Sequence, residues 1–210
     1  MMNDNTNHRV LIQFAHPALQ NSRVNRRLIS GVESMAGVTF NDLYERYPTL
    51  YIDVEREQEL LTQHDIVILH HPFYWYSTPA ILKEWQDLVL QHGWAYGRQG
   101  RALEGKFLFN VISTGGPRQA YTTEGRNHFT LRQLLAPLEQ TATLCRMHYL
   151  APFAVHGTHL MPAEQIELYT RDYHHLLQAL VEGRVDLDRA AEVERLNDHL
   201  AQLIQDDHVR

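Results

Sequence analysis

Short apolar segments alternate with amphipathic ones along most of the chain, and this alternation limits the fold more than any other feature. Three of the five strand-like segments are almost wholly apolar, which is typical of a parallel sheet that is covered on both faces. Strands with one solvated face alternate apolar and polar residues instead. The five segments are residues 10–15, 38–43, 65–71, 107–113 and 149–155.

The intervening segments have the apolar periodicity of helices that pack one face on a sheet. Side chains that cap free backbone N–H groups stand where several of these helices should begin. In the second helix, Glu55 and Glu57 are placed to favour the N-terminal dipole. The expected helices begin at Ser22, near Asp53, at Thr78 before Pro79, and at Thr130 with a bend at Pro137, and a fifth covers about 162–183.

Five strands alternating with five helices indicate a doubly wound α/β fold, and right-handed crossovers leave few topologies. The five-stranded, flavodoxin-like parallel order 2-1-3-4-5 fits best. A dinucleotide-binding Rossmann half is disfavoured because no G-x-G-x-x-G motif follows the first strand. We assign residues 1–183 to this domain and residues 184–210 to an extension.

The extension contains a repeat of apolar residues at three- and four-residue steps. This spacing predicts one extra C-terminal helix over 186–210, packed on its own domain or on a second subunit. The residues that form its apolar edge are Val193, Leu196, Leu200 and Leu203.

Charge and composition exclude several classes of protein. The formal net charge is −6 and no basic run is present, so nucleic acid is not expected as a partner. Residues 1–8 lack a secretory pattern, and Cys145 is the only cysteine, so we expect a cytoplasmic protein without an intrachain disulfide. Close histidine pairs at 70–71, 156/159 and 174–175 lack a carboxylate on the same helical face, so no bound metal is expected.

Three unusual loops follow the first, third and fourth strands, whose carboxyl ends meet at the edge where open α/β sheets bind ligands. The first loop, residues 16–25, leads into a helix. Backbone N–H groups at that helix start, together with Ser22 and Asn25, are suited to a phosphate. A helix cap without a ligand explains the same residues equally well.

The second loop places four adjacent aromatic residues at a strand end. Flat apolar rings in an accessible loop need a ligand or a partner, and a tricyclic isoalloxazine ring would stack on them. Taken alone, the rings are explained slightly better by core packing or by a subunit interface than by a ligand. The four residues are Phe73, Tyr74, Trp75 and Tyr76.

The third loop, Ser113-Thr114-Gly115-Gly116-Pro117, follows the fourth strand directly. Paired glycines allow positive φ and let the backbone approach a ring edge closely, and successive N–H groups form an anion-accepting concavity. A plain tight turn is the alternative. The convergence of all three loops on one sheet edge favours a ligand site.

Several of these residues form motifs of a known family. The order Ala15-His16-Pro17 with Ser22 and Asn25, then His71 to Trp85, then Thr114-Gly115-Gly116 followed by Tyr121, resembles the NAD(P)H:quinone oxidoreductase (DT-diaphorase-like) family. Within that family, the pattern is most similar to the ancillary proteins of bacterial glutathione-regulated potassium-efflux antiporters. The resemblance covers about residues 8–183.

The resemblance implies a flavodoxin-like homodimer that binds flavin at the subunit interface and uses NAD(P)H and a quinone alternately in one pocket. It implies FMN, with FAD as the alternative, and leaves NADH against NADPH open. The resemblance implies by position that the phosphate end is held by His16, Ser22, Val24 and Asn25, and the ring by Pro72, Phe73, Tyr74, Trp75, Tyr76, Thr114, Gly115 and Gly116. Ser113 is also expected to bind the cofactor.

The resemblance also places Tyr121 near the reacting edge of the flavin, with a histidine partner that handles protons. That partner's position is Asn127 in this chain, so either His128 replaces it after a small loop shift or the relay is missing.

Two functions follow from the resemblance. One is a flavin-dependent NAD(P)H oxidoreductase that reduces quinones or similar electrophiles by hydride transfer. The other is a regulatory subunit that docks from the cytosol on a membrane potassium/proton antiporter, with little or no turnover, at the inner face of the cell membrane.

Overall fold

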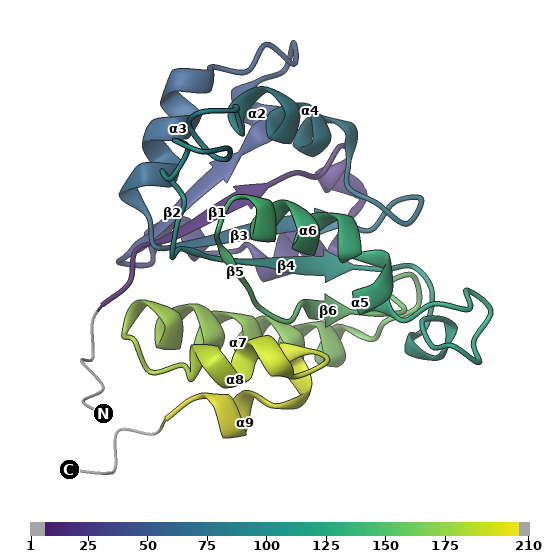
Figure 1. Ribbon diagram of the computed structural model, residues 1–210. Coiled ribbons are helices and arrows are strands. Elements are labelled where there is room, and N and C mark those ends of the chain that lie inside the picture. Colours follow the sequence, from purple (N-terminus) through teal and green to yellow (C-terminus); the bar gives the residue numbers. More distant parts are fainter. Residues whose placement is uncertain (1–6, 206–210) are drawn as a thin grey trace.

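A parallel sheet with helices on both faces forms the centre of the protein, as the computed structural model shows for residues 7–205 (Figure 1). The strand order is β2-β1-β3-β4-β5, with β6 paired to β4, which confirms the order 2-1-3-4-5. The strands are β1 Val10–Phe14, β2 Val38–Asp42, β3 Ile66–Pro72, β4 Phe107–Ser113, β5 His148–Tyr149 and β6 Phe153–Val155.

The expected fifth strand is interrupted, so that β5 and β6 are separate short strands. Between them, Leu150 still donates its N–H to Leu108 O at 2.9 Å, but Ala151 donates to Ala190 O at 3.0 Å. Pro152 has no N–H, and its carbonyl accepts from Leu196 N at 3.0 Å. The C-terminal part of the chain therefore takes the hydrogen bonds that an unbroken strand would give to β4.

The helices largely begin where the capping residues predicted. The Ser22 and Asp53 side chains each accept a backbone hydrogen bond, and Thr130 forms a complete capping box with Gln133. The prediction of Thr78 as a cap is wrong, because the helix begins one residue later, after Pro79. The helices are α1 Arg23–Leu28, α2 Leu43–Arg46, α3 Val54–Gln63, α4 Ala80–Val89, α5 Leu131–Leu134, α6 Ala136–Leu144, α7 Ala163–Val181, α8 Leu187–Glu192 and α9 Leu200–Leu203.

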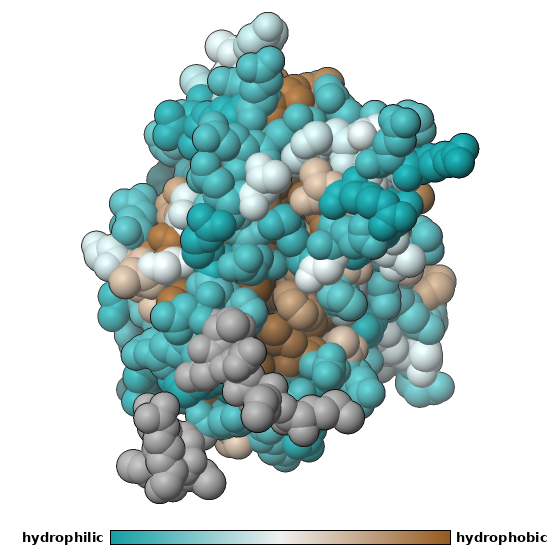
Figure 2. All heavy atoms as spheres, turned by 60° about the vertical axis from the view of Figure 1, so that its left-hand side comes forward, coloured by the Kyte–Doolittle hydropathy of each residue, from teal (hydrophilic) through white to brown (hydrophobic). Residues whose placement is uncertain are grey.

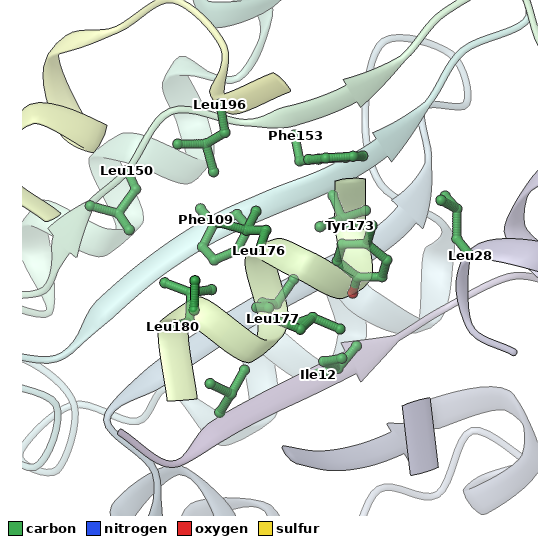
Figure 3. Packing of buried hydrophobic residues seen from close by; sticks show 14 of the residues in the cluster. Ile12, Leu28, Phe109, Leu150, Phe153, Tyr173, Leu176, Leu177, Leu180 and Leu196 are labelled. Atoms are coloured by element: carbon green, nitrogen blue, oxygen red, sulfur yellow. The ribbon is translucent and has the colours of Figure 1, made fainter. Parts of the chain in front are cut away.

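Two apolar cores lie on opposite faces of the sheet. On one face, α1, α7 and the C-terminal helices pack on strand residues such as Ile12 and Phe109, and Tyr173 of α7 belongs to this core (Figure 3). On the other face, α2 to α6 pack around Trp85, which is almost fully buried. The side at the amino ends of the strands, which comes forward in Figure 2, is mostly hydrophilic with smaller hydrophobic patches.

The C-terminal extension does not form the single helix predicted over 186–210. It forms α8, a 3₁₀ turn at Leu196–Asp198 and α9, with extended backbone at Val193 between the first two. The Asn197 side chain accepts a hydrogen bond from Ala154 N at 2.7 Å, and this bond anchors the 3₁₀ turn to β6 where the prediction had a continuous helix. Leu196 and Leu203 join the core of the main domain. Residues 206–210 of that prediction lie outside the described residues.

A buried polar cluster lies beneath β1 and β2, on the face that α3 and α4 cover. The Glu57 carboxylate is fully buried, so its predicted role at the helix dipole is not its main one. It accepts hydrogen bonds from Gln13 at 2.7 Å, Tyr47 at 2.7 Å and Trp85 at 2.9 Å, and also from Asn41. A buried carboxylate is stable only with such a set of donors.

Two adjacent histidines at the end of β3 are fully buried. The His71 Nδ1–H donates to Pro72 O at 2.9 Å, because Asn110 donates to its Nε2 at 3.0 Å. Desolvation by burial lowers the pKa of His70 to about 3 and that of His71 to about 4. Both rings are therefore neutral in the folded protein near pH 7.

Because the two histidines are buried in their neutral form, we expect acid to destabilise the fold. An unfolded histidine takes up a proton near pH 6.5, so below that pH the unfolded state binds more protons than the folded state. The free energy of unfolding should be fully present above about pH 6.5 and fall by ~1.4 kcal/mol per pH unit for each histidine down to about pH 4. Urea unfolding between about pH 7.5 and pH 4.5 measures the slope. In His70→Gln this slope should be smaller by about one proton, because glutamine does not titrate. A free energy of unfolding that does not change with pH would contradict the prediction.

Candidate functional site

A cavity of about 440 Å³ opens at the carboxyl edge of the sheet. Its volume is in the usual range for small-molecule sites. Segments far apart in sequence meet there, because the carboxyl ends of β1, β3, β4 and β6 face the same side (Figure 1). The lining residues are His16, Ala18, Asn21, Ser22, Arg23, Val24, Asn25, Pro72, Phe73, Tyr74, Ser113, Gly115, Thr158 and His159.

The loop after β1 supplies one end of the cavity with hydrogen-bond donors. The His16 ring is buried, and its Nδ1 accepts from Ala18 N at 3.2 Å. Burial lowers the pKa of His16, so the neutral ring carries its proton on Nε2 and can donate there. Ser22 caps α1 by accepting from Asn25 N at 3.1 Å.

The side-chain amide of Asn25 organises the hydroxyl groups at this end. Its Nδ2 donates to Ser22 Oγ and Ser113 Oγ, both at 2.9 Å, and its Oδ1 lies 3.1 Å from His70 Nε2. Tyr173 OH lies 3.3 Å from His70 Nδ1, so the phenol donates to Nδ1 and Nε2–H donates to Asn25. The network uses the acceptor side of Ser22 and Ser113, which leaves both hydroxyl hydrogens to donate to a bound anion.

The aromatic loop after β3 divides between the cavity and the surface. Phe73 is buried, and its backbone N–H donates a hydrogen bond to Ser113 O at 2.8 Å. Tyr74 lines the cavity. Trp75 and Tyr76 form the centre of a tight turn that Ser77 N closes on Tyr74 O at 3.0 Å. Both have positive φ, at 51° and 62°, and neither lines the cavity. Bulky residues rarely adopt this conformation, and such outliers cluster at functional sites.

The loop after β4 is held against the loop after β6. Thr114 N donates to Val155 O at 2.9 Å, and Gly157 N donates to Gly116 O at 2.9 Å. Neither Gly115 nor Gly116 uses the positive φ that glycine allows. A Cβ at Gly115 would overlap the ring of the exposed His159, so that this ring would have to move.

Tyr121 lies beside these two loops, outside the lining of the cavity. Its ring centroid is 6.3 Å from that of Phe73 and 5.3 Å from that of His156. Desolvation by burial raises the pKa of Tyr121. Asn127 accepts a hydrogen bond from Tyr76 OH at 3.3 Å, whereas His128 is exposed with a positive φ of 59°. The structure does not bring His128 into the cavity.

Several lining residues were missed by the sequence analysis, chiefly Thr158 and His159 on the loop after β6. The signal was available, because the last strand of a parallel sheet ends at the same edge as the others. Arg23, which also lines the cavity, donates from Nη2 to Met161 O at 3.2 Å. Among residues 7–205, no group of three or more His, Cys, Asp or Glu residues has the arrangement of a metal site.

No helix within residues 7–205 is both long and apolar enough to span a membrane.

Comparison with known proteins gives consistent matches. Residues 8–179 match the Flavodoxin_2 family, described as a flavodoxin-like fold. The glutathione-regulated potassium-efflux system ancillary protein KefG of Pectobacterium atrosepticum is 43% identical over 165 residues, which are 79% of this chain and 90% of that protein.

Two solved structures are similar at comparable identity. General stress protein 14 of Treponema denticola, solved in complex with FMN, has a TM-score of 0.78 at 36% identity and covers 82% of this chain and 99% of its own. An NADPH-quinone reductase of P. pentosaceus has a TM-score of 0.73 at 35% identity, with coverages of 80% and 96%. The chain therefore belongs to the Flavodoxin_2 family of flavodoxin-like proteins.

Proposed function

We propose that this protein is an FMN-dependent NAD(P)H oxidoreductase that reduces quinones or similar electrophiles. The observation that carries the proposal is the cavity itself, where hydroxyl donors fixed by Asn25 lie at one end and the Tyr74 ring and the Gly115 backbone also contribute to the lining. A polar cluster beside a flat apolar surface is the pattern that a phosphorylated aromatic cofactor needs.

The residues present fit the phosphate end of FMN. Ser22 and Ser113 each have a hydroxyl hydrogen to donate, and His16 offers Nε2–H. Hydrogen bonds to an anion are among the stronger ones, and fixed donors bind without further ordering. Arg23 adds a positive charge at the cavity wall.

The residues also fit the ring end. Tyr74 and Phe73 provide aromatic surface, and the absence of side chains at Gly115 and Gly116 lets the backbone come close to a ring. A flavin held by these residues would supply hydride transfer from NAD(P)H to a quinone. In this reaction Tyr121 donates its phenol hydrogen bond where negative charge develops.

The similar structures support this choice of cofactor and substrate. General stress protein 14 of Treponema denticola was solved with FMN, and the protein of P. pentosaceus is named an NADPH-quinone reductase. We adopt FMN over FAD on this basis, and NAD(P)H as the hydride donor.

FMN and riboflavin together test the two ends of the site. Ser22→Ala removes a donor to the phosphate, so affinity for FMN should fall about ten- to a hundredfold while affinity for riboflavin stays near that of the wild type. Gly116→Val should weaken both ligands, because its γ carbons extend from a Cβ that already lies 3.4 Å from the Tyr121 ring. Quenching of flavin fluorescence measures both affinities.

Ser22→Thr is the matched control, since it keeps the hydroxyl and the helix cap. It should retain FMN better than Ser22→Ala. A wild-type protein that binds neither flavin would refute the proposal. An equal loss of FMN and riboflavin in Ser22→Ala would show that the phosphate is held elsewhere.

We also propose that the protein acts as a homodimer through the aromatic loop. Trp75 is 93% exposed at the tip of a turn with positive φ at both central residues. An exposed tryptophan in a strained turn needs a partner surface, and tryptophan is enriched among the residues that dominate binding energy at interfaces.

Trp75→Ser should therefore weaken self-association at least about tenfold, as measured by sedimentation velocity over a range of protein concentrations. Tyr51→Ser is the control, because Tyr51 is 86% exposed on a different loop. Equal weakening by both variants would argue against a specific role for Trp75, and a monomeric wild type would exclude the dimer.

A second candidate role is favoured by the relatives named as ancillary proteins of a glutathione-regulated potassium-efflux system. In this role the protein docks from the cytosol on the membrane antiporter and regulates its opening. The two roles are compatible, because one chain can bind flavin and a membrane partner at different surfaces.

Potassium efflux separates the two roles. Cells that express the antiporter with wild-type protein should release potassium after an electrophile, and the protein should co-purify with the antiporter. If Gly116→Val protein restores efflux fully, regulation does not need the flavin site. If efflux is lost although Gly116→Val protein still co-purifies, flavin binding and regulation are linked. Failure of the wild type to co-purify or to change efflux would reject this role.

A further inference from the structure

A groove, which we call the α1–α7 groove, runs between α1 and α7 on the face of the sheet that these helices cover. It consists of two adjoining hollows of about 550 Å³ and 380 Å³, which share Arg27, Ser30 and Glu167. The residues of α7 that line the groove extend from Ala163 to Gln178. At a helical rise of about 1.5 Å per residue, the groove is therefore about 22 Å long.

The charge of the groove is opposite to that of the protein as a whole. Its lining includes Arg23, Arg26, Arg27 and Arg171, whereas the formal net charge of the chain is −6. Among the described residues, Glu167 is the one carboxylate that lines the groove. Positive charge gathered in one place on an acidic protein favours a partner that carries negative charge.

Two of these arginines are available to an anion. The guanidinium groups of Arg26 and Arg171 are exposed, and neither forms an ion pair or a hydrogen bond with the described part of the chain. Arg27 is already engaged, because Glu167 accepts from its Nε at 2.5 Å and from its Nη2 at 2.7 Å. Arg23 also lines the cavity at the carboxyl edge of the sheet. We therefore expect Arg26 and Arg171 to make the first contacts with a ligand of the groove.

Contacts between the two helices hold the walls of the groove in place. His174 Nε2–H donates to Leu28 O at 2.9 Å, since a carbonyl oxygen can only accept. The Arg27–Glu167 pair joins the same two helices. A groove with fixed walls binds a ligand without the cost of ordering the groove itself.

The shape of the groove favours an extended peptide over other anions. An extended chain rises about 3.3 Å per residue, so about seven residues span the length of the groove. A single phosphate group would occupy only a small part of that length, and a flat lipid surface does not enter a recess between two helices. Ser30 and Gln178 add side chains that can hydrogen-bond to a peptide backbone.

We propose that the α1–α7 groove docks an extended, acidic segment of a protein partner, with the guanidinium groups of Arg26 and Arg171 on carboxylates of that segment. Arginine suits this role because its planar group can bind a carboxylate through two parallel hydrogen bonds. The inference rests on the second role proposed above, and it assigns the surface through which the protein contacts the antiporter.

A labelled peptide tests the groove without the antiporter. The probe is a fluorescein-labelled octapeptide in which glutamate and serine alternate, and the control peptide has glutamine in place of each glutamate. Fluorescence anisotropy at low salt should show that the glutamate peptide binds at least about tenfold more tightly than the glutamine peptide.

Three variants assign this binding to the groove. Arg26→Gln combined with Arg171→Gln should weaken binding of the glutamate peptide about tenfold. Arg46→Gln combined with Arg98→Gln removes the same charge from α2 and from the loop after α4, on the other face of the sheet, and should change the affinity less than about twofold. Glu167→Gln should strengthen binding about threefold, because its partner arginine is then released.

Co-purification with the antiporter tests the partner. Protein with both Arg26→Gln and Arg171→Gln should no longer co-purify. Its affinity for FMN should stay near that of the wild type, because neither residue lines the cavity at the carboxyl edge. Circular dichroism verifies that each variant is folded.

Several results would overturn the inference. These are equal binding of the two peptides, equal weakening by the two double variants, weaker binding in Glu167→Gln, or undiminished co-purification of the groove variant. Vesicles with roughly a third phosphatidylglycerol that bind the wild type but not the groove variant, without any peptide binding, would assign the groove to a lipid surface instead. Failure of the wild type to co-purify would reject the second role, while the peptide titration still decides whether the groove binds an acidic chain.

Discussion

The side-chain amide of Asn25 is the interaction on which the candidate site depends. It ties the start of α1, through Ser22, to the end of β4, through Ser113, and it is oriented by His70 on β3. His70 is in turn oriented by Tyr173 on α7. Because the Asn25 amide and the His70 ring each have one allowed hydrogen-bond direction, these contacts between two strands and two helices fix a single arrangement of hydroxyl groups at the cavity.

The sheet was predictable because its signal is local. Continuous apolar strands and capping side chains such as Ser22, Asp53 and Thr130 mark elements within a few residues of themselves. The errors arose where distant contacts decided the backbone. Pro152 O accepts a hydrogen bond from Leu196 N, and the Asn197 side chain accepts one from Ala154 N. No periodicity in either segment reveals this pairing.

The site was predictable in part for a similar reason. The loops after β1, β3 and β4 were found because each has unusual composition and all three converge on one edge. The loop with His156 and His159 has no such composition, and its histidines were weighed only as metal ligands. Side-chain direction was also hidden, since Phe73 and Trp75 are two residues apart but one is buried and the other 93% exposed.

The buried Glu57 cluster has a consequence for how the strands find their alignment. Gln13 and Asn41 are direct partners across β1 and β2, and both donate to the same carboxylate. A shift of one residue between these strands would turn the amides away from Glu57 and leave its buried charge with two fewer donor side chains. The polar cluster therefore selects the native register of β1 and β2, because a shifted register would lose hydrogen bonds to a buried charge.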